Sequence, residues 1–185
     1  MKTLDIVGID PSMSATGIAF TRTATTTVKD SEFTGDKRLV LLYAMTTAAS
    51  DVADVVILED LPANAMSAGI TGRSQGVVRL ALQQRGVPYI AVPPATLKKA
   101  ATGKGNCKKD LMREAMQDHF TEELPTKGPD KVDDNQVDAW WLREVGLYLF
   151  DQPSHIHDSV KPNLAQYKEQ ADVIREVFED PVLGG

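Results

Sequence analysis

The chain has 185 residues, of which 42% are hydrophobic and 25% are charged. That composition predicts a globular domain and excludes a collagen-like rod and a fully disordered chain. No window approaches the roughly 18 consecutive apolar residues of a membrane-spanning helix, so we expect no membrane association. The single cysteine, Cys107, and the lack of an export signal before the strand-like run that begins at Leu4 favour a reducing cytoplasm.

The charged residues are distributed unevenly along the chain. A formal net charge of −6 at pH 7 argues against a protein whose whole surface attracts nucleic acid. Between Ala95 and Arg113, however, six basic residues are opposed by only one acidic residue, Asp110. A solvated helix face and a DNA-binding surface both fit such a run. The basic run consists of Lys98, Lys99, Lys104, Lys108, Lys109 and Arg113.

The first half of the chain predicts a meander that leads into a parallel unit. Residues 4–10 and 17–20 are apolar runs joined by a turn, which predicts a hairpin, and the β-branched residues 25–28 predict a third strand at its edge. Apolar positions at helical spacing within residues 37–49 indicate a helix, and the run 55–59 then indicates a fully buried strand.

The second half predicts one more strand and several helices. The strand covers residues 89–92, and residues 126–131 are expected to form a Pro/Gly loop. We expect an α/β domain over residues 1–152 and a C-terminal extension with one helix over residues 153–185. The expected helices cover residues 67–85, 95–101, a segment that Asn106 caps and that continues to Phe120, 133–150, and 164–178 after a break at Pro153 and Pro162.

Two carboxylates stand at the ends of predicted strands. Asp10 ends the first strand and Glu59 ends the fourth. If these strands lie side by side and parallel, the two carboxylates are about 5 Å apart, which is one strand spacing. Ligands commonly gather at the carboxyl ends of such strands.

A second acidic segment opens the predicted helix that carries both tryptophans. Asp134 and Asp138 are four residues apart, and Asn135 and Asp138 are three apart, so these side chains share one helix face. Acidic residues in a first turn complement the helix macrodipole, which is an ordinary explanation for Asp133 and Asp134. Asp138 lies a turn further, next to Trp140, where an unpaired carboxylate is costly.

These acidic residues need a cation if they meet, because converging carboxylates repel one another. All-oxygen ligands favour Mg²⁺, or Mn²⁺ in its place, over zinc or copper. A pair of such ions can activate water and hold the attacking and leaving oxygens of a phosphodiester. The acidic residues and the basic run together therefore predict metal-dependent chemistry on DNA.

Four short motifs occur in order within residues 6–149. They are Gly8-Ile9-Asp10-Pro11 followed by Thr16-Gly17, then Ile57-Leu58-Glu59, then Lys98 with Thr102-Gly103-Lys104-Gly105 and Lys109, and finally Asp134 to Asp138-Ala139. In this order and spacing they resemble the motifs of RuvC-type Holliday junction resolvases in the ribonuclease H-like superfamily, especially divergent phage members. Gln75 also lies where that family has a Gln in a small-residue helix.

The resemblance implies a fold, an activity and a set of site residues. The fold is a mixed five-stranded sheet with helices on both faces. The activity is a Mg²⁺-dependent endonuclease that cuts four-way DNA junctions, leaves 5′-phosphate and 3′-hydroxyl ends, and acts as a homodimer in a bacterial or phage-infected cell. Residues 67–85 are expected to form part of the dimer face, and the basic run is expected to bind DNA. The implied metal ligands are Asp10, Glu59, Asp134 and Asp138, with Lys98 and Lys109 acting at the scissile phosphate.

The chain departs from the family pattern at two places. Cellular members often carry Asp three residues before the last Asp, whereas this chain has Asn135 there. Either Asp134 takes over as the ligand, which we favour, or Asn135 ligates through its carbonyl. Cellular members also carry an aromatic residue shortly after the second acid, where this chain has Leu61-Pro62-Ala63-Asn64. Flaps and forks are therefore alternative substrates.

Two other functions fit parts of this pattern. The turn after Asp10 also resembles the first phosphate motif of actin-like ATPases, but those proteins need a duplicated domain, for which this chain is too short. The other alternative is a module that binds branched DNA without cutting it, because Asn135 weakens one ligand position. Metal-dependent cleavage distinguishes these alternatives from the nuclease.

Overall fold

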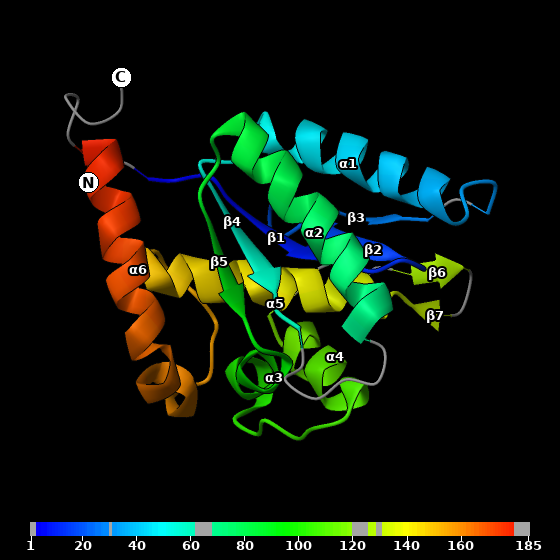
Figure 1. Cartoon of the computed structure of the whole chain (residues 1–185). Helices are drawn as coiled ribbons and strands as arrows, with labels where there is room; N and C mark the ends of the chain where they lie inside the picture. The colour runs from blue at the N-terminus through cyan, green and yellow to red at the C-terminus, as the bar shows by residue number, and fades with distance from the viewer. Residues whose placement is uncertain (1–2, 30, 62–67, 120–125, 129–130, 180–185) are drawn as a thin grey trace.

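A mixed five-stranded sheet forms the centre of the molecule (Figure 1). The computed structural model describes residues 3–29, 31–61, 68–119, 126–128 and 131–179. The strand order is β3-β2-β1-β4-β5, with β1 antiparallel to β2 and parallel to β4, which confirms the predicted fold class. The strands are β1 (Ile6–Asp10), β2 (Thr16–Ala19), β3 (Thr25–Val28), β4 (Val55–Glu59) and β5 (Tyr89–Val92).

Helices cover both faces of this sheet (Figure 1). The helices α1 (Asp36–Ser50) and α2 (Ala68–Arg85) lie on one face, where Leu42 and Leu82 pack against Val7 and Leu58. The opposite face is covered by α5 (Asp134–Leu149), and α3 (Pro94–Thr102) and α4 (Lys109–Gln117) pack against that helix. The turn η1 (Asp158–Val160) leads into α6 (Lys161–Glu179), which lies beside the edge strand β5.

Glycines allow α5 to lie unusually close to the sheet. A Cβ atom on Gly8 in β1 would lie 2.0 Å from the Ala139 carbonyl oxygen of α5, and a Cβ atom on Gly17 in β2 would lie 1.9 Å from the Asn135 carbonyl oxygen. Any side chain at either position would therefore force the helix away. This close approach brings the first turns of α5 over the ends of β1 and β2.

Three local predictions are wrong. Asn106 does not cap α4, because a turn in which Cys107 N–H bonds to the Lys104 carbonyl comes first and the helix begins only after Lys108. Pro162 does not break the chain before the last helix. It lies in the first turn of α6, where a backbone N–H would have no acceptor within the helix, so proline is tolerated.

The third wrong prediction is the loop at residues 126–131. The structure instead pairs β6 (Thr126–Gly128) with β7 (Lys131–Val132) in a short antiparallel ladder. Gly and Pro residues that indicate a loop also occur between short paired strands, so composition alone does not separate the two. Phe120 lies outside the described residues. Among the described residues, no helix has both the length and the apolar character needed to cross a membrane.

Candidate active site

The parallel pairing of β1 and β4 brings two strand-ending carboxylates together. Ile9 lies opposite Leu58, so Asp10 and Glu59 are the next residues on neighbouring strands. Because side chains alternate along a strand and Ile9 and Leu58 belong to the core beneath α1 and α2, both acids point to the α5 face. A hydrogen bond joins the two carboxyl groups. The expected proximity of these acids is confirmed.

The helix α5 supplies the third carboxylate. Asp138 lies between the two residues whose backbone contacts Gly8 and Gly17, and it is only 6% exposed. Its Oδ2 accepts a hydrogen bond from the Nζ of Lys109 on α4, at 2.7 Å. Asp138 also raises the pKa of both strand carboxyls, which places all three charges within electrostatic reach of one another.

These carboxylates line a pocket of about 340 Å³ between the sheet, α3, α4 and α5. Lys98 of α3 and Lys109 of α4 line the same pocket, as does Asn135. The pocket also includes three polar residues that the motifs had not singled out. Two of them follow Asp10 and Glu59 closely in the sequence, and the third lies on α2. Closeness to these two acids could therefore have identified the first two as pocket residues. The added residues are Ser12, Asp60 and Thr71.

The three carboxyl groups hold their protons more tightly than usual. Burial, followed by the charges of Glu59 and Asp138, raises the pKa of Asp10 well above its ordinary value. Burial and the charge of Asp138 raise the pKa of Glu59 to about 7. Burial also raises the pKa of Asp138, although Lys109 opposes that shift. Ionising all three carboxyl groups together is therefore costly, and a bound cation would offset that cost.

The two candidates for a fourth ligand occupy different environments. Asp134 Oδ1 accepts a hydrogen bond from Arg113 at 2.7 Å, and Asp134 is not among the residues that line the pocket. Asn135 does line it, and its side-chain N–H donates to Asp133 Oδ1 at 3.0 Å, which fixes the orientation of the amide. Asp133 caps the helix by accepting from the backbone N–H of Asn135, so its role there is structural.

The donor set fits a hard divalent cation, because its carboxylate and amide groups offer oxygen ligands. Among the described residues, no three acidic, histidine or cysteine side chains are arranged so that they could hold a metal ion as they stand. Asp138 is already paired with the ammonium group of Lys109, whose Nζ lies 2.7 Å from its Oδ2.

The basic run is divided among several environments. Lys98 and Lys109 face the acidic pocket, whereas Arg113 pairs with Asp134 and Asp110. Lys99 donates to Asn163 of α6 at 2.8 Å. Lys104 and Lys108 are exposed on the connection between α3 and α4. The basic run is therefore not one uniform surface. Two of its members, Lys98 and Lys109, line the pocket that contains Asp10, Glu59 and Asp138.

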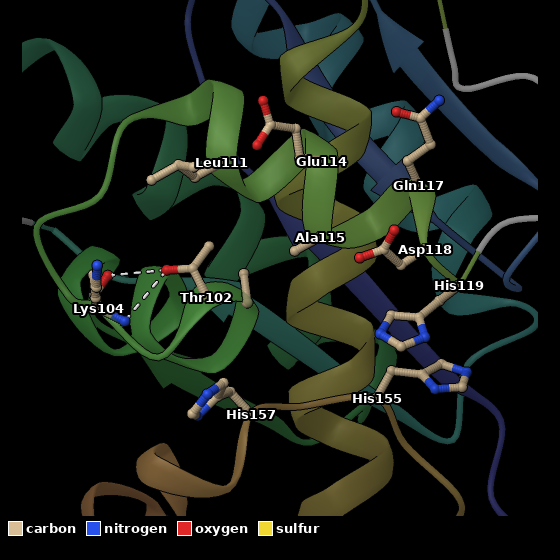
Figure 2. Close-up of a pocket in the computed structure, with 11 residues that line it drawn as sticks. Thr102, Lys104, Leu111, Glu114, Ala115, Gln117, Asp118, His119, His155 and His157 are labelled. Atoms are coloured by element: carbon tan, nitrogen blue, oxygen red, sulfur yellow. Dashed lines mark hydrogen bonds between the residues drawn. The ribbon is translucent and has the colours of Figure 1, made fainter.

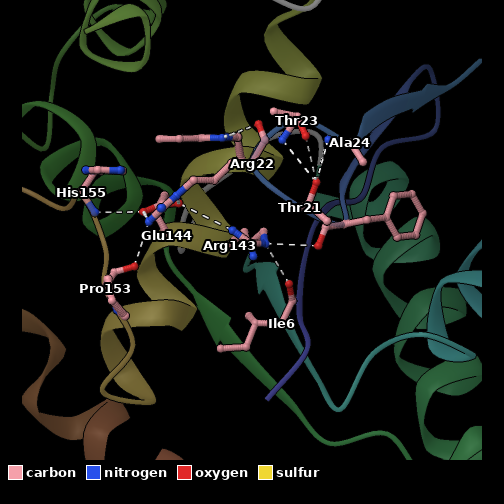
Figure 3. Close-up of polar contacts among 11 residues, drawn as sticks. Ile6, Thr21, Arg22, Thr23, Ala24, Arg143, Glu144, Pro153 and His155 are labelled. Carbon is pink, nitrogen blue, oxygen red and sulfur yellow. Dashed lines mark hydrogen bonds and ion pairs between the residues drawn. The ribbon is translucent and has the colours of Figure 1, made fainter. Parts of the chain in front are cut away.

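A fourth buried acid, Glu144, lies further along α5 (Figure 3). Its side chain is fully buried and accepts hydrogen bonds from Arg22 Nε at 3.0 Å and from the backbone N–H of His155 at 2.9 Å. Arg143 Nη1 lies 3.7 Å from it. Like Asp138, it is a charged residue within an apolar helical stretch, and that signal could have identified it.

Comparisons with known proteins identify sequence similarity to two RuvC nucleases. The chain is 29% identical over 145 residues to the crossover junction endodeoxyribonuclease RuvC of Paenarthrobacter aurescens (strain TC1), covering 71% of this chain and 77% of that protein. It is 34% identical over 61 residues to the RuvC of Synechococcus sp. (strain WH7803), covering 33% of this chain and 40% of that protein. No family model matches the chain.

Solved structures show the same fold. A T. thermophilus RuvC in complex with a Holliday junction substrate superposes with a TM-score of 0.60 at 22% identity, covering 76% of this chain and 91% of that one. A second T. thermophilus RuvC structure gives a TM-score of 0.55 at 21% identity, over 75% and 90% of the two chains. The chain is therefore similar in sequence to RuvC crossover junction endodeoxyribonucleases and shares the ribonuclease H-like fold of the solved RuvC structures.

Proposed function

We propose that this protein is a divalent-metal-dependent endonuclease that cleaves branched DNA, with the four-way junction as its main substrate. The observation that carries the proposal is the meeting of Asp10, Glu59 and Asp138 in one pocket with Lys98 and Lys109. The sequence similarity to RuvC nucleases supports the choice of DNA junctions over other phosphodiesters.

Asp10, Glu59 and Asp138 would hold the metal, which we propose is Mg²⁺ with Mn²⁺ as a substitute. The lining of the pocket favours Asn135 over Asp134 as the fourth ligand, which reverses our preference from the sequence. When bound, the metal supplies an activated water and compensates the charge that develops on the phosphate. The raised pKa values of the three carboxyls give the site its preference for a bound cation.

The two lysines act on the DNA. Lys98 and Lys109 approach the carboxylates from α3 and α4, so each can place an ammonium group against a phosphate oxygen at the pocket. Fixed positive charges at this position stabilise the extra negative charge of the transition state. The exposed residues Lys104 and Lys108 would bind the flanking backbone, a contribution that weakens with salt.

The remaining features of the proposal concern assembly and products. We propose that the protein acts as a homodimer in the cytoplasm, with α2 in the interface, since a two-fold symmetric junction suits a two-fold symmetric enzyme. The products would carry 5′-phosphate and 3′-hydroxyl ends. Residues 1–152 would form the nuclease domain, and residues 153–185 its C-terminal extension.

Cleavage of defined DNA structures tests the proposal. Purified protein is incubated with labelled four-way junctions, flaps, forks and plain duplex, with Mg²⁺ or with EDTA. We expect paired, symmetric nicks in the four-way junction only when Mg²⁺ is present. Equal cutting of flaps and forks would indicate a general branch nuclease. Binding of the junction with no cleavage in Mg²⁺ or Mn²⁺ would indicate a non-cutting binding module.

A further inference from the structure

Residues 153–163 contact both the helix of Asp138, α5, and the helix of Lys98, α3. This segment follows α5, passes a pocket of about 660 Å³ between α3, α4 and itself, and leads into α6. All three histidines of the chain line this pocket. His119 and His155 lie together on one side of it, and His157 lies on the other side, toward Thr102 and Lys104 (Figure 2).

The segment is anchored firmly to α5 at its beginning (Figure 3). Arg22 Nη2 donates to the Pro153 carbonyl at 2.8 Å, and the same guanidinium pairs with the buried Glu144. Glu144 also accepts the backbone N–H of His155. The ring of His155 stacks on that of His119, which follows α4, with 4.2 Å between the centroids. The position of the segment is therefore set by polar contacts and by ring stacking.

The other end of the segment caps α3. The last carbonyl groups of a helix have no partner within the helix. In α3 the Lys99 carbonyl accepts from Gly103 N–H at 2.9 Å, and the Ala100 carbonyl accepts from the backbone N–H of His157 at 2.7 Å. The hydroxyl of Ser159 approaches the Gly103 carbonyl at 3.4 Å. A distant part of the chain thus supplies donors for the end of this helix.

The imidazole of His157 packs directly on the residue that ends α3. A Cβ atom on Gly103 would lie 2.9 Å from Cε1 and Nε2 of His157, and Gly103 has a φ of +78°, which suits glycine. One turn earlier, Lys99 donates to Asn163 Oδ1 of α6. Main-chain, ring and side-chain contacts therefore all fasten the C-terminal half of α3 to this segment.

Lys98 belongs to the same turn of α3, but it faces the acidic pocket instead of α6. It lines the acidic pocket, and its charge lowers the pKa of both Glu59 and Asp138. Its carbonyl accepts the hydroxyl of Thr102 at 2.9 Å, which couples it to the capped end of the helix. A shift of this end would move the Lys98 ammonium relative to the carboxylates.

We propose that residues 153–163 position Lys98 for phosphodiester cleavage by fastening the end of α3, with His157 and Asn163 as the positioning residues. This inference rests on the proposed nuclease function. It gives the C-terminal extension a role in cleavage, although none of its described residues, 153–179, lines the acidic pocket.

His157→Pro is the central variant, because it removes the backbone donor and the ring while the φ of −67° at this position suits proline. His157→Ala keeps the donor and removes only the ring, and Asn163→Ala removes only the contact with Lys99. Gln170→Ala on the exposed side of α6 is the matched control. Far-UV circular dichroism and thermal unfolding show whether each variant is folded.

Single-turnover cleavage and junction binding are measured for each variant in Mg²⁺. We expect His157→Pro to slow cleavage about tenfold and Asn163→Ala less, with junction affinity within twofold of the wild type. In a Lys98→Ala background the same changes should have no further effect on the rate, because the group they position is missing. Equal losses with and without Lys98 would overturn the inference.

Hydrogen exchange of the α3 amides is a second readout that needs no cleavage. We expect exchange in α3 to accelerate in His157→Pro and to stay unchanged in Gln170→Ala. If exchange accelerates but the wild-type protein cleaves no DNA, the proposed function fails while the contact is real. Unchanged exchange in α3 would reject the fastening itself, and His157→Ala and Asn163→Ala provide this test if His157→Pro does not fold.

Discussion

Two buried carboxylates on α5, Asp138 and Glu144, have different partners although they lie on the same helix. Their side chains are 8% and 0% exposed. Glu144 accepts hydrogen bonds from Arg22 and from a backbone N–H, with Arg143 nearby. Asp138 accepts a hydrogen bond from Lys109, and the charge of Lys98 also lowers its pKa. It also lies near the carboxyls of Asp10 and Glu59, whose pKa values it raises.

The difference separates an acid with a structural role, Glu144, from Asp138, which we propose binds the metal. Burying a charge is tolerated when partners satisfy it, and Glu144 meets that condition within the fold. The three carboxyl groups around Asp138 are costly to ionise where they are buried, and a bound cation would offset that cost. We therefore expect the middle of α5 to contribute to stability through Glu144 and its first turns to contribute to metal binding through Asp138.

The largest expected effect is on catalysis. Asp138→Asn should reduce Mg²⁺-dependent junction cleavage roughly a thousandfold, because an amide is a far weaker ligand for a hard cation than a carboxylate. Junction binding in a gel-shift assay should persist. Asp110→Asn, an exposed acid on α4, is the matched control and should cleave normally. Comparable nicking by Asp138→Asn would contradict the assignment of the site.

The second expected effect is on stability and concerns the other carboxylate. Glu144→Ala should lower the free energy of unfolding by about 3 to 4 kcal/mol, because Arg22 and the backbone N–H of His155 lose their buried partner. Urea unfolding measures the change, and Asp138→Asn should change the same quantity by less than about 1 kcal/mol. A loss of under about 1 kcal/mol for Glu144→Ala would contradict the structural role that we assign to Glu144.

The third effect is the pH dependence of stability in EDTA. The pKa of Glu59 is raised to about 7 from an ordinary value of 4.5, so the folded state binds this proton more tightly than the unfolded state does. The corresponding stability is fully present below pH 4.5 and is lost as the pH rises through about 7. Relative to wild type, Glu59→Gln should therefore gain roughly 2 kcal/mol between pH 4.5 and pH 8 in urea unfolding. If the stabilities of the two proteins change with pH in parallel, the pKa of Glu59 is not raised in the folded state.

The smallest effect distinguishes the two candidates for the fourth ligand. Asn135→Ala should raise the Mg²⁺ concentration for half-maximal cleavage roughly fivefold, whereas Asp134→Asn should change it by less than about twofold, since Arg113 already holds Asp134. Metal titrations of single-turnover rates give both values. The reverse order of effects would restore Asp134 as the ligand.

Much of the fold and the central pair of acids could be predicted from local patterns. Alternating and continuous apolar runs identified the five strands of the sheet. Because Asp10 and Glu59 end two of these strands, assuming that the two strands are parallel neighbours placed both acids at the same edge of the sheet. The short ladder of β6 and β7 and the start of α4 were missed, because Gly, Pro and Asn permit several turns and their choice depends on what packs nearby.

By itself, the sequence determined which residues carry charge, how they repeat along each element, and therefore which face each element buries. Tertiary structure alone decided that Lys109 meets Asp138, that Arg113 draws Asp134 away while Asn135 enters the pocket, and that His157 caps α3. These outcomes depend on contacts between residues that are far apart in the sequence: 21 positions for Arg113 and Asp134, 29 for Lys109 and Asp138, and 57 for Ala100 and His157. Periodicity reports only the local environment of a residue, whereas its partner is set by how closely helices and strands approach, as Gly8 and Gly17 allow for α5.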